Sequence, residues 1–181
     1  QVYQAATPTD EYLLTKSRRY LDPDATTLAE AFLGAGYRTA HMGKWHLGLT
    51  QEHWPDQHGF EVTFHSAPDP GPPGSTYFSP HGVHAEGEHI DDRLGTEAIK
   101  YITEHKDEPF YLNLWMYDCH GPWEAKQDLI QKFARKESGP DGHTNPVYAA
   151  MLKTMDDNFG RVMTALDELG IADNTIVVFF S

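Results

Sequence analysis

Residues 36–48 read GYRTAHMGKWHLG, a short β-forming run that leads into a loop bounded by glycines. The run is compatible with a strand until Gly43 interrupts it. The loop then carries Lys44, Trp45 and His46. A strand that ends in such a loop is typical of an open α/β sheet, which binds ligands beyond the carboxyl ends of its strands.

Lys44 and His46 are of the residue types that an anion site uses. Lys44 supplies a point charge for a tetrahedral oxyanion, and His46 can give or take a proton near neutral pH. The alternative is a β-turn with a solvated Lys44 and a packed His46. Spacing alone favours that alternative.

The neighbouring segments predict alternating helices and strands. Thr27 and Glu30 fit a capping box, so we expect a helix from Leu28 to Ala35, which Gly36 ends. The other expected elements are a strand over 37–42, a helix over 93–105, a strand over 110–117 that is buried on both faces, a helix over 145–169 and a buried strand over 175–180. This order predicts an α/β fold with a mostly parallel sheet and helices on both faces.

The stretch 49–87 is long, irregular and rich in proline and glycine, which is typical of a binding loop. Its histidines have no helical spacing or cysteine partner, so we expect scattered surface side chains. They are His53, His58, His65, His81 and His84. Asp91 and Asp92 lie where acidic residues cap a helix, and we expect capping. No metal site is predicted in this chain.

A second polar segment, DCHGPW at 118–123, follows the strand predicted over 110–117. Its His120 lies just past a strand end, where open α/β sheets place their chemistry. The alternative is a loop histidine with ordinary partners. Cys119 is the one cysteine, which excludes an internal disulfide, and we interpret it as a buried or half-buried structural thiol.

The composition limits the possible partners. The chain has 27 acidic and 14 basic residues and a formal charge of -13, which argues against nucleic acid and anionic membrane surfaces. A small anionic substrate stays possible because a local cationic pocket can outweigh the global charge. No apolar run approaches the ~20 residues of a membrane span. Since the chain begins at Gln1, the missing signal peptide says nothing of export.

The GKWHLG core of residues 36–48 resembles the second signature of the type I sulfatases, which belong to the alkaline-phosphatase-like superfamily. The HGPW run at 120–123 resembles the H-x-P segment of that family, and MDDNFGRV at 155–162 resembles one of its structural helices. The resemblance implies an incomplete alkaline-phosphatase-like fold. Residues 1–181 would be the central part of the catalytic domain, and 49–87 would line the substrate pocket.

The resemblance also implies a reaction, the hydrolysis of a sulfate monoester. By position in the motifs, Lys44 would contact the sulfate and the nucleophile, and His46 would hydrogen-bond the nucleophile. His120 would reach the sulfate or the bridging oxygen as a candidate proton donor. The predicted catalytic residues are therefore Lys44, His46 and His120, of which Lys44 and His120 also bind substrate.

The family uses calcium and a formylglycine made from a cysteine, and the resemblance implies that both lie outside this chain. The C-x-P-x-R nucleophile motif and the Asp-Asn-Gly calcium motif do not occur in it, nor does the Asp-Asp pair that follows the first strand of the family, and Cys119 lacks the nucleophile context. We therefore expect these 181 residues alone to be inactive. Two alternatives stay open, namely a phosphate or phosphonate ester hydrolase of the same superfamily and a non-catalytic anion-binding relative.

The family's range and the aromatic content suggest a carbohydrate sulfate ester as substrate. The resemblance favours a periplasmic or secreted location. The oligomeric state is open at this stage.

Overall fold

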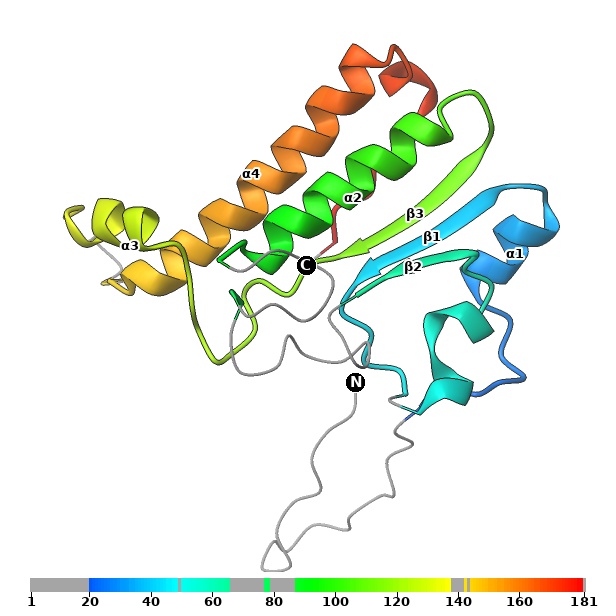
Figure 1. Cartoon of the computed structure of the whole chain (residues 1–181), viewed down its shortest axis with the longest axis horizontal. Helices are drawn as coiled ribbons and strands as arrows, with labels where there is room; N and C mark the ends of the chain where they lie inside the picture. The colour runs from blue at the N-terminus through cyan, green and yellow to red at the C-terminus, as the bar shows by residue number, and fades with distance from the viewer. Residues whose placement is uncertain are drawn as a thin grey trace, which may run out of the picture.

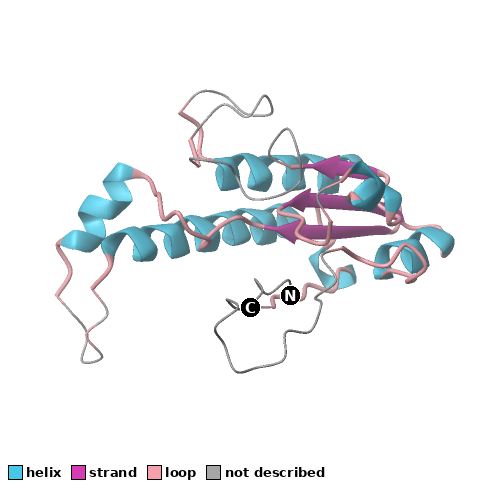
Figure 2. Cartoon of the chain, turned by 90° about the horizontal axis from the view of Figure 1, so that it is seen from below, coloured by secondary structure: helices cyan, strands magenta, loops and turns pink. Residues whose placement is uncertain are grey.

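The structure is a computed structural model that describes residues 20–48, 50–65, 77–78, 87–137, 142 and 144–180. Within these residues, the strands β1 (Arg38–Gly43), β2 (Val62–Phe64) and β3 (Phe110–Trp115) form one sheet in the order β2-β1-β3. Both pairings are parallel, and Figure 2 shows the strands running in the same direction. The predicted parallel sheet is confirmed.

Helices cover both faces of this sheet, as predicted (Figure 1). Successive strand residues face opposite sides. Ala40 and Met42 therefore pack with α2 (Ile90–Glu104) and α4 (Pro146–Glu168). On the other face, α1 (Leu28–Gly34) contributes Ala29 to a smaller core. The remaining helices are α3 (Gln127–Ala134) and the 3-10 turns η1 (Gln51–His53), η2 (Pro55–Gln57) and η3 (Ala172–Asn174).

Local signals set most helix ends. Thr27 and Glu30 form the predicted capping box at α1. Asn145 caps α4 by accepting the N–H groups of Val147 and Tyr148, so the helix predicted over 145–169 is confirmed. The helix predicted over 93–105 begins earlier, at Ile90, because His89 is its N-cap.

Three expectations about strands are wrong. The stretch 49–87 is not wholly irregular, because it contains β2 and two 3-10 turns. β3 is half-buried rather than buried on both faces, because it lies at the edge of the described sheet. The segment 175–180 forms no strand within the described part of the chain, and the side chains of Ile176 and Phe180 are 93% and 94% exposed.

None of the helices in the described residues is both long enough and apolar enough to cross a membrane.

Candidate active site

The segments that carry the predicted site residues leave the sheet at the same edge. β1 and β3 run in register up to the pair Gly43 and Trp115, and the N–H of Lys44 donates to the carbonyl oxygen of Trp115 at 2.8 Å. Lys44 and His46 therefore follow the carboxyl end of β1, while His120 follows that of β3. Carboxyl ends of parallel strands are where open α/β sheets bind ligands.

Gly43 allows this close approach of β1 and β3. Its φ is +107°, and a Cβ atom there would lie 1.8 Å from the carbonyl oxygen of Trp115. Only glycine combines that backbone conformation with an absent side chain. The glycine of the motif is thus a structural requirement for placing Lys44 beside the end of β3.

Trp45 anchors the loop between Lys44 and His46. Its side chain is buried, its Nε1 donates to the carbonyl oxygen of His53 at 2.8 Å, and its ring stacks on Trp115 with centroids 5.7 Å apart. Lys44 is half-buried and His46 is exposed. A buried indole therefore holds the loop, while the two candidate site residues keep access to solvent.

The charges at this edge influence one another. Burial lowers the pKa of Lys44. Burial also lowers the pKa of His46, and the positive charges of Lys44 and His120 lower it further. Lys44 and His120 are thus close enough to His46 to disfavour its protonation. His46 is consequently biased toward the neutral imidazole, which can accept a hydrogen bond as well as donate one.

His120 has a defined tautomer. Its Nδ1 is bonded to the carbonyl oxygen of Gly121, and a carbonyl can only accept, so Nδ1 carries the hydrogen. The Nε2 atom is left to bind or release the second proton. The exposed His120 ring is therefore suited to proton transfer through Nε2.

The turn that carries His120 is fixed from two sides. Asp91 accepts the N–H groups of Tyr117 at 2.9 Å and Asp118 at 2.8 Å. The Tyr77 hydroxyl lies 2.9 Å from the carbonyl oxygen of Tyr117 and 2.7 Å from that of His120. Asp91 lies in the first turn of α2, yet its carboxylate bonds these amides. The expectation that it caps the helix is therefore wrong.

A group that could hold a metal ion lies beneath this turn. Ligand atoms of His89, Asp91 and Asp118 lie within 4.8 Å of one another. Calcium takes roughly six to eight oxygen ligands, whereas this group includes an imidazole. Both Asp91 oxygens already accept backbone N–H groups, and His89 Nδ1 accepts the N–H of Asp91 at 3.3 Å. The group does not fit calcium, and we interpret it as structural.

Two other residues considered in the sequence analysis, Cys119 and His58, are partly or fully shielded from solvent. Cys119 is half-buried and free, as expected, and burial raises the pKa of its thiol to about 11. His58 is fully buried beside Trp45, so the expectation of a surface position was wrong for it. His81, His84 and most of 66–86 lie outside the described residues.

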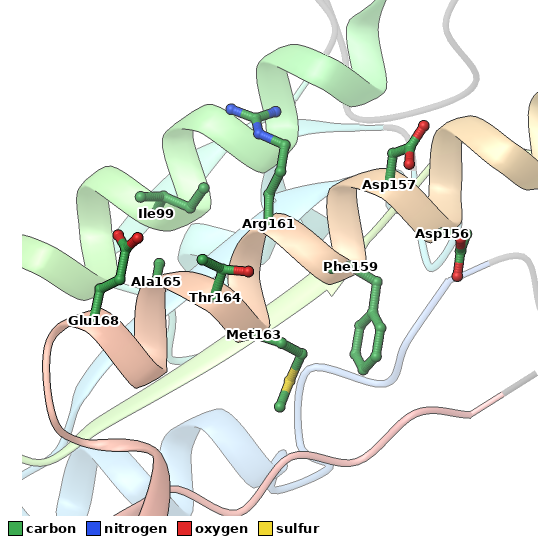
Figure 3. Close-up of a pocket in the computed structure, with 10 residues that line it drawn as sticks. Ile99, Asp156, Asp157, Phe159, Arg161, Met163, Thr164, Ala165 and Glu168 are labelled. Carbon is green, nitrogen blue, oxygen red and sulfur yellow. The ribbon is translucent and has the colours of Figure 1, made fainter.

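The hollow along α4 is a separate feature, lined by Ile99 of α2 and residues of α4 between Asp156 and Glu168. Figure 3 shows that its charged side chains do not converge, since Asp156 and Asp157 point to opposite sides of α4. Binding sites usually hold a few polar groups directed at one point. The edge with Lys44, His46 and His120 is therefore the better candidate.

The chain is similar to known proteins of one family. The family model described as Sulfatase matches residues 3–181. An uncharacterised sulfatase of Schizosaccharomyces pombe is 26% identical over 90% of this chain and 41% of its own length. The N-acetylgalactosamine-6-sulfatase of Mus musculus is 29% identical over 85% of this chain and 32% of its own length.

A solved structure shares the fold. The crystal structure of Ps i-CgsB in complex with k-i-k-neocarrahexaose superposes with a TM-score of 0.72 at 24% identity, covering 88% of this chain and 40% of that one. The alkaline-phosphatase-like arrangement expected from the sequence is thus supported. The chain spans about two fifths, or less, of the length of these relatives.

Proposed function

Because the chain belongs to the sulfatase family, we propose that the protein hydrolyses a sulfate monoester and that Lys44, His46 and His120 act in the reaction. One observation carries the proposal, namely that these residues follow the carboxyl ends of two paired parallel strands. The S–O bond of the ester breaks, water supplies the fourth oxygen of the sulfate, and the alcohol takes a proton.

Lys44 would hold the sulfate oxygens as charge builds on them, which is electrostatic stabilisation of the transition state. Its half-buried position strengthens that interaction, because charges attract more strongly where water is partly excluded. His46, whose pKa is lowered first by burial and then by the charge of Lys44, would hydrogen-bond the attacking group.

His120 would protonate the departing alcohol oxygen through Nε2. Its Nδ1–H is held by Gly121, so the ring is oriented before substrate arrives. A positioned general acid contributes about 10²–10⁴-fold to the rate. The contribution grows with the basicity of the leaving alcohol.

The nucleophile and the metal belong to the same proposal. A formylglycine would supply the attacking oxygen and a calcium ion would bind the sulfate charge, both held by residues outside these 181. The described residues include no oxygen cluster suited to calcium, so their own share is to bind the anion and transfer the proton.

A carbohydrate sulfate is the substrate class that we propose. The side chain of Trp123 is 56% exposed and lies close to His120 in the chain. An exposed indole offers an apolar face with a polar tip, which can stack on a sugar ring. The names of two relatives refer to a sulfated amino sugar and a neocarrahexaose. A periplasmic or secreted location would suit such a substrate.

The test is turnover of 4-nitrophenyl sulfate and 4-nitrophenyl phosphate by the full-length protein and its variants. We expect faster turnover of the sulfate, and a loss of about 10²-fold or more in Lys44→Ala. Lys100→Ala is the matched control, since Lys100 is an exposed lysine on α2. Equal turnover in the two lysine variants, or a preference for phosphate, would contradict the proposal.

Trp123→Ala tests the carbohydrate assignment. It should raise the KM for a sulfated oligosaccharide and leave that for 4-nitrophenyl sulfate unchanged. An equal effect on both substrates would argue against stacking on a sugar.

A further inference from the structure

The side chain of Tyr77 connects the backbone turn that carries His120 to the segment before α2. Tyr77 is fully buried. Its hydroxyl lies within hydrogen-bond distance of two carbonyl oxygens, those of Tyr117 and His120. These residues are separated by 40 and 43 positions in the sequence.

The main chain of Tyr77 is held as well. Its N–H donates to the Glu124 carboxylate at 2.7 Å, and its carbonyl oxygen accepts the N–H of Ile90 at 2.9 Å. Because the ring is also fully buried, the hydroxyl is held in one position by packing and by its hydrogen bonds. Tyr77 therefore connects the start of α2, the segment after His120 and the turn itself.

The Tyr77 hydroxyl contacts the peptide group that follows His120, and this peptide influences the orientation of the His120 ring. The His120 N–H already donates to the carbonyl oxygen of Tyr117 at 2.9 Å, which closes the turn locally. The Tyr77 hydroxyl adds a bond to the carbonyl oxygen of His120, which orients the peptide that follows. That peptide leads to Gly121, whose carbonyl oxygen holds His120 Nδ1.

We propose that Tyr77 is a positioning residue, whose hydroxyl sets the direction of the His120 ring for proton transfer to the leaving group. The proposal rests on the proposed function, because it needs His120 to be the general acid. Proton transfer is sensitive to donor geometry, and a misplacement of about 1 Å can cost about 10²-fold in rate.

The experiment compares Tyr77→Phe with Tyr101→Phe in the full-length protein. Tyr101 is also a buried tyrosine, but among the described residues its hydroxyl has no hydrogen-bond partner. Both substitutions remove one oxygen atom from the same core. Only the first removes a bond to the turn of His120.

The readout is kcat for a series of sulfate esters, from 4-nitrophenyl sulfate, which has a good leaving group, to simple alkyl sulfates, which have poor ones. We expect Tyr77→Phe to lose about tenfold on alkyl sulfates and little on 4-nitrophenyl sulfate. Tyr101→Phe should match the wild type throughout. A general loss of folded protein would lower all rates equally, so the dependence on the leaving group separates positioning from stability.

His120→Ala separates failure of this inference from failure of the proposed function. If the wild type turns over no sulfate ester, the proposed function is wrong, and so is the inference. The same holds for the role of His120 if His120→Ala leaves the dependence on the leaving group unchanged. If His120→Ala steepens the dependence while Tyr77→Phe behaves like Tyr101→Phe, only the inference is wrong.

Glu124→Gln covers the case in which Tyr77→Phe does not fold. It weakens the charge-assisted bond to the Tyr77 backbone and leaves the hydroxyl in place. We expect a smaller change in the same direction, with alkyl sulfates affected more than 4-nitrophenyl sulfate. An unchanged dependence on the leaving group would overturn the inference.

Discussion

Substituting Gly43 by alanine tests how the sheet positions the candidate site. An alanine Cβ would lie 1.8 Å from the carbonyl oxygen of Trp115, whereas ordinary contacts lie at 3.4–4 Å. The end of β1 and the end of β3 must therefore separate by more than 1 Å. The hydrogen bond from Lys44 N–H to Trp115, now 2.8 Å, cannot survive that displacement.

Three separate effects should lower the free energy of unfolding of Gly43→Ala. Holding a non-glycine residue at positive φ costs about 1 to 2 kcal/mol, and overpacking typically adds about 1 to 3 kcal/mol. The lost hydrogen bond adds about 1 kcal/mol. We expect Gly43→Ala to destabilise the protein by about 4 kcal/mol, a large part of the roughly 5–15 kcal/mol that holds a domain folded.

Gly36→Ala is the matched control. Gly36 also has a positive φ, +86°, but no heavy atom of the described residues lies within 4 Å of its virtual Cβ. It should show the backbone cost alone, about 1 to 2 kcal/mol, and keep full turnover, since it precedes β1.

The assay is urea denaturation of the full-length variants followed by far-UV circular dichroism, together with turnover of 4-nitrophenyl sulfate. Gly43→Ala should lose turnover even where it remains folded, because Lys44 is displaced. Equal urea midpoints for the two glycine variants would refute the argument that contact with Trp115 requires glycine at this position.

Further predictions concern buried and capping residues. Burial lowers the pKa of His41 to about 4. Between about pH 6.5 and 4, His41 is therefore protonated in the unfolded chain and neutral in the folded protein. Stability should fall over that range as the pH drops, by up to about 3 kcal/mol, and urea midpoints of His41→Gln should show a flatter pH dependence. Burial, and next the charge of Asp91, raises the pKa of Asp118 to about 10. The folded state therefore holds a proton that the unfolded chain releases, and stability falls as the pH rises above about 4. Asp118→Asn should raise the urea midpoint at pH 8 more than at pH 5, and an equal change at both would contradict the assignment. Asn145→Ala removes the α4 cap and should cost about 1 kcal/mol in the same assay without changing KM.

The sequence predicted the elements whose signals are local. The capping box of Thr27 and Glu30 and the apolar repeat of α4 each depend on residues within a few turns, so the structure confirmed both. β2 was missed because its three residues, Val62–Phe64, become a strand only by pairing with β1. The segment 175–180 was predicted as a strand from its apolar composition, which carries no information about a pairing partner.

The sequence predicted the residues of the candidate site, but it did not predict the residues that hold the site in position. Motif resemblance singled out Lys44, His46 and His120, and the parallel topology explains why they leave the sheet at one edge. Asp91 carried a misleading signal, because an acidic residue at a helix start reads as a cap. Tyr77 carried no local signal, since the partners of its hydroxyl lie 40 and 43 positions further along the chain.

The position of Tyr77 has a consequence for how such a protein can diverge. It fixes the chain roughly midway between β2 and α2, so the sequence between them is divided into two shorter segments that meet at Tyr77. The entropy of closing a loop rises only with the logarithm of its length. Insertions and deletions in either segment should therefore cost little free energy of folding, and the anchor at Tyr77 separates the change from the other segment and from the turn of His120. A lineage could therefore lengthen or shorten one segment at a time while the turn of His120 stays where it is.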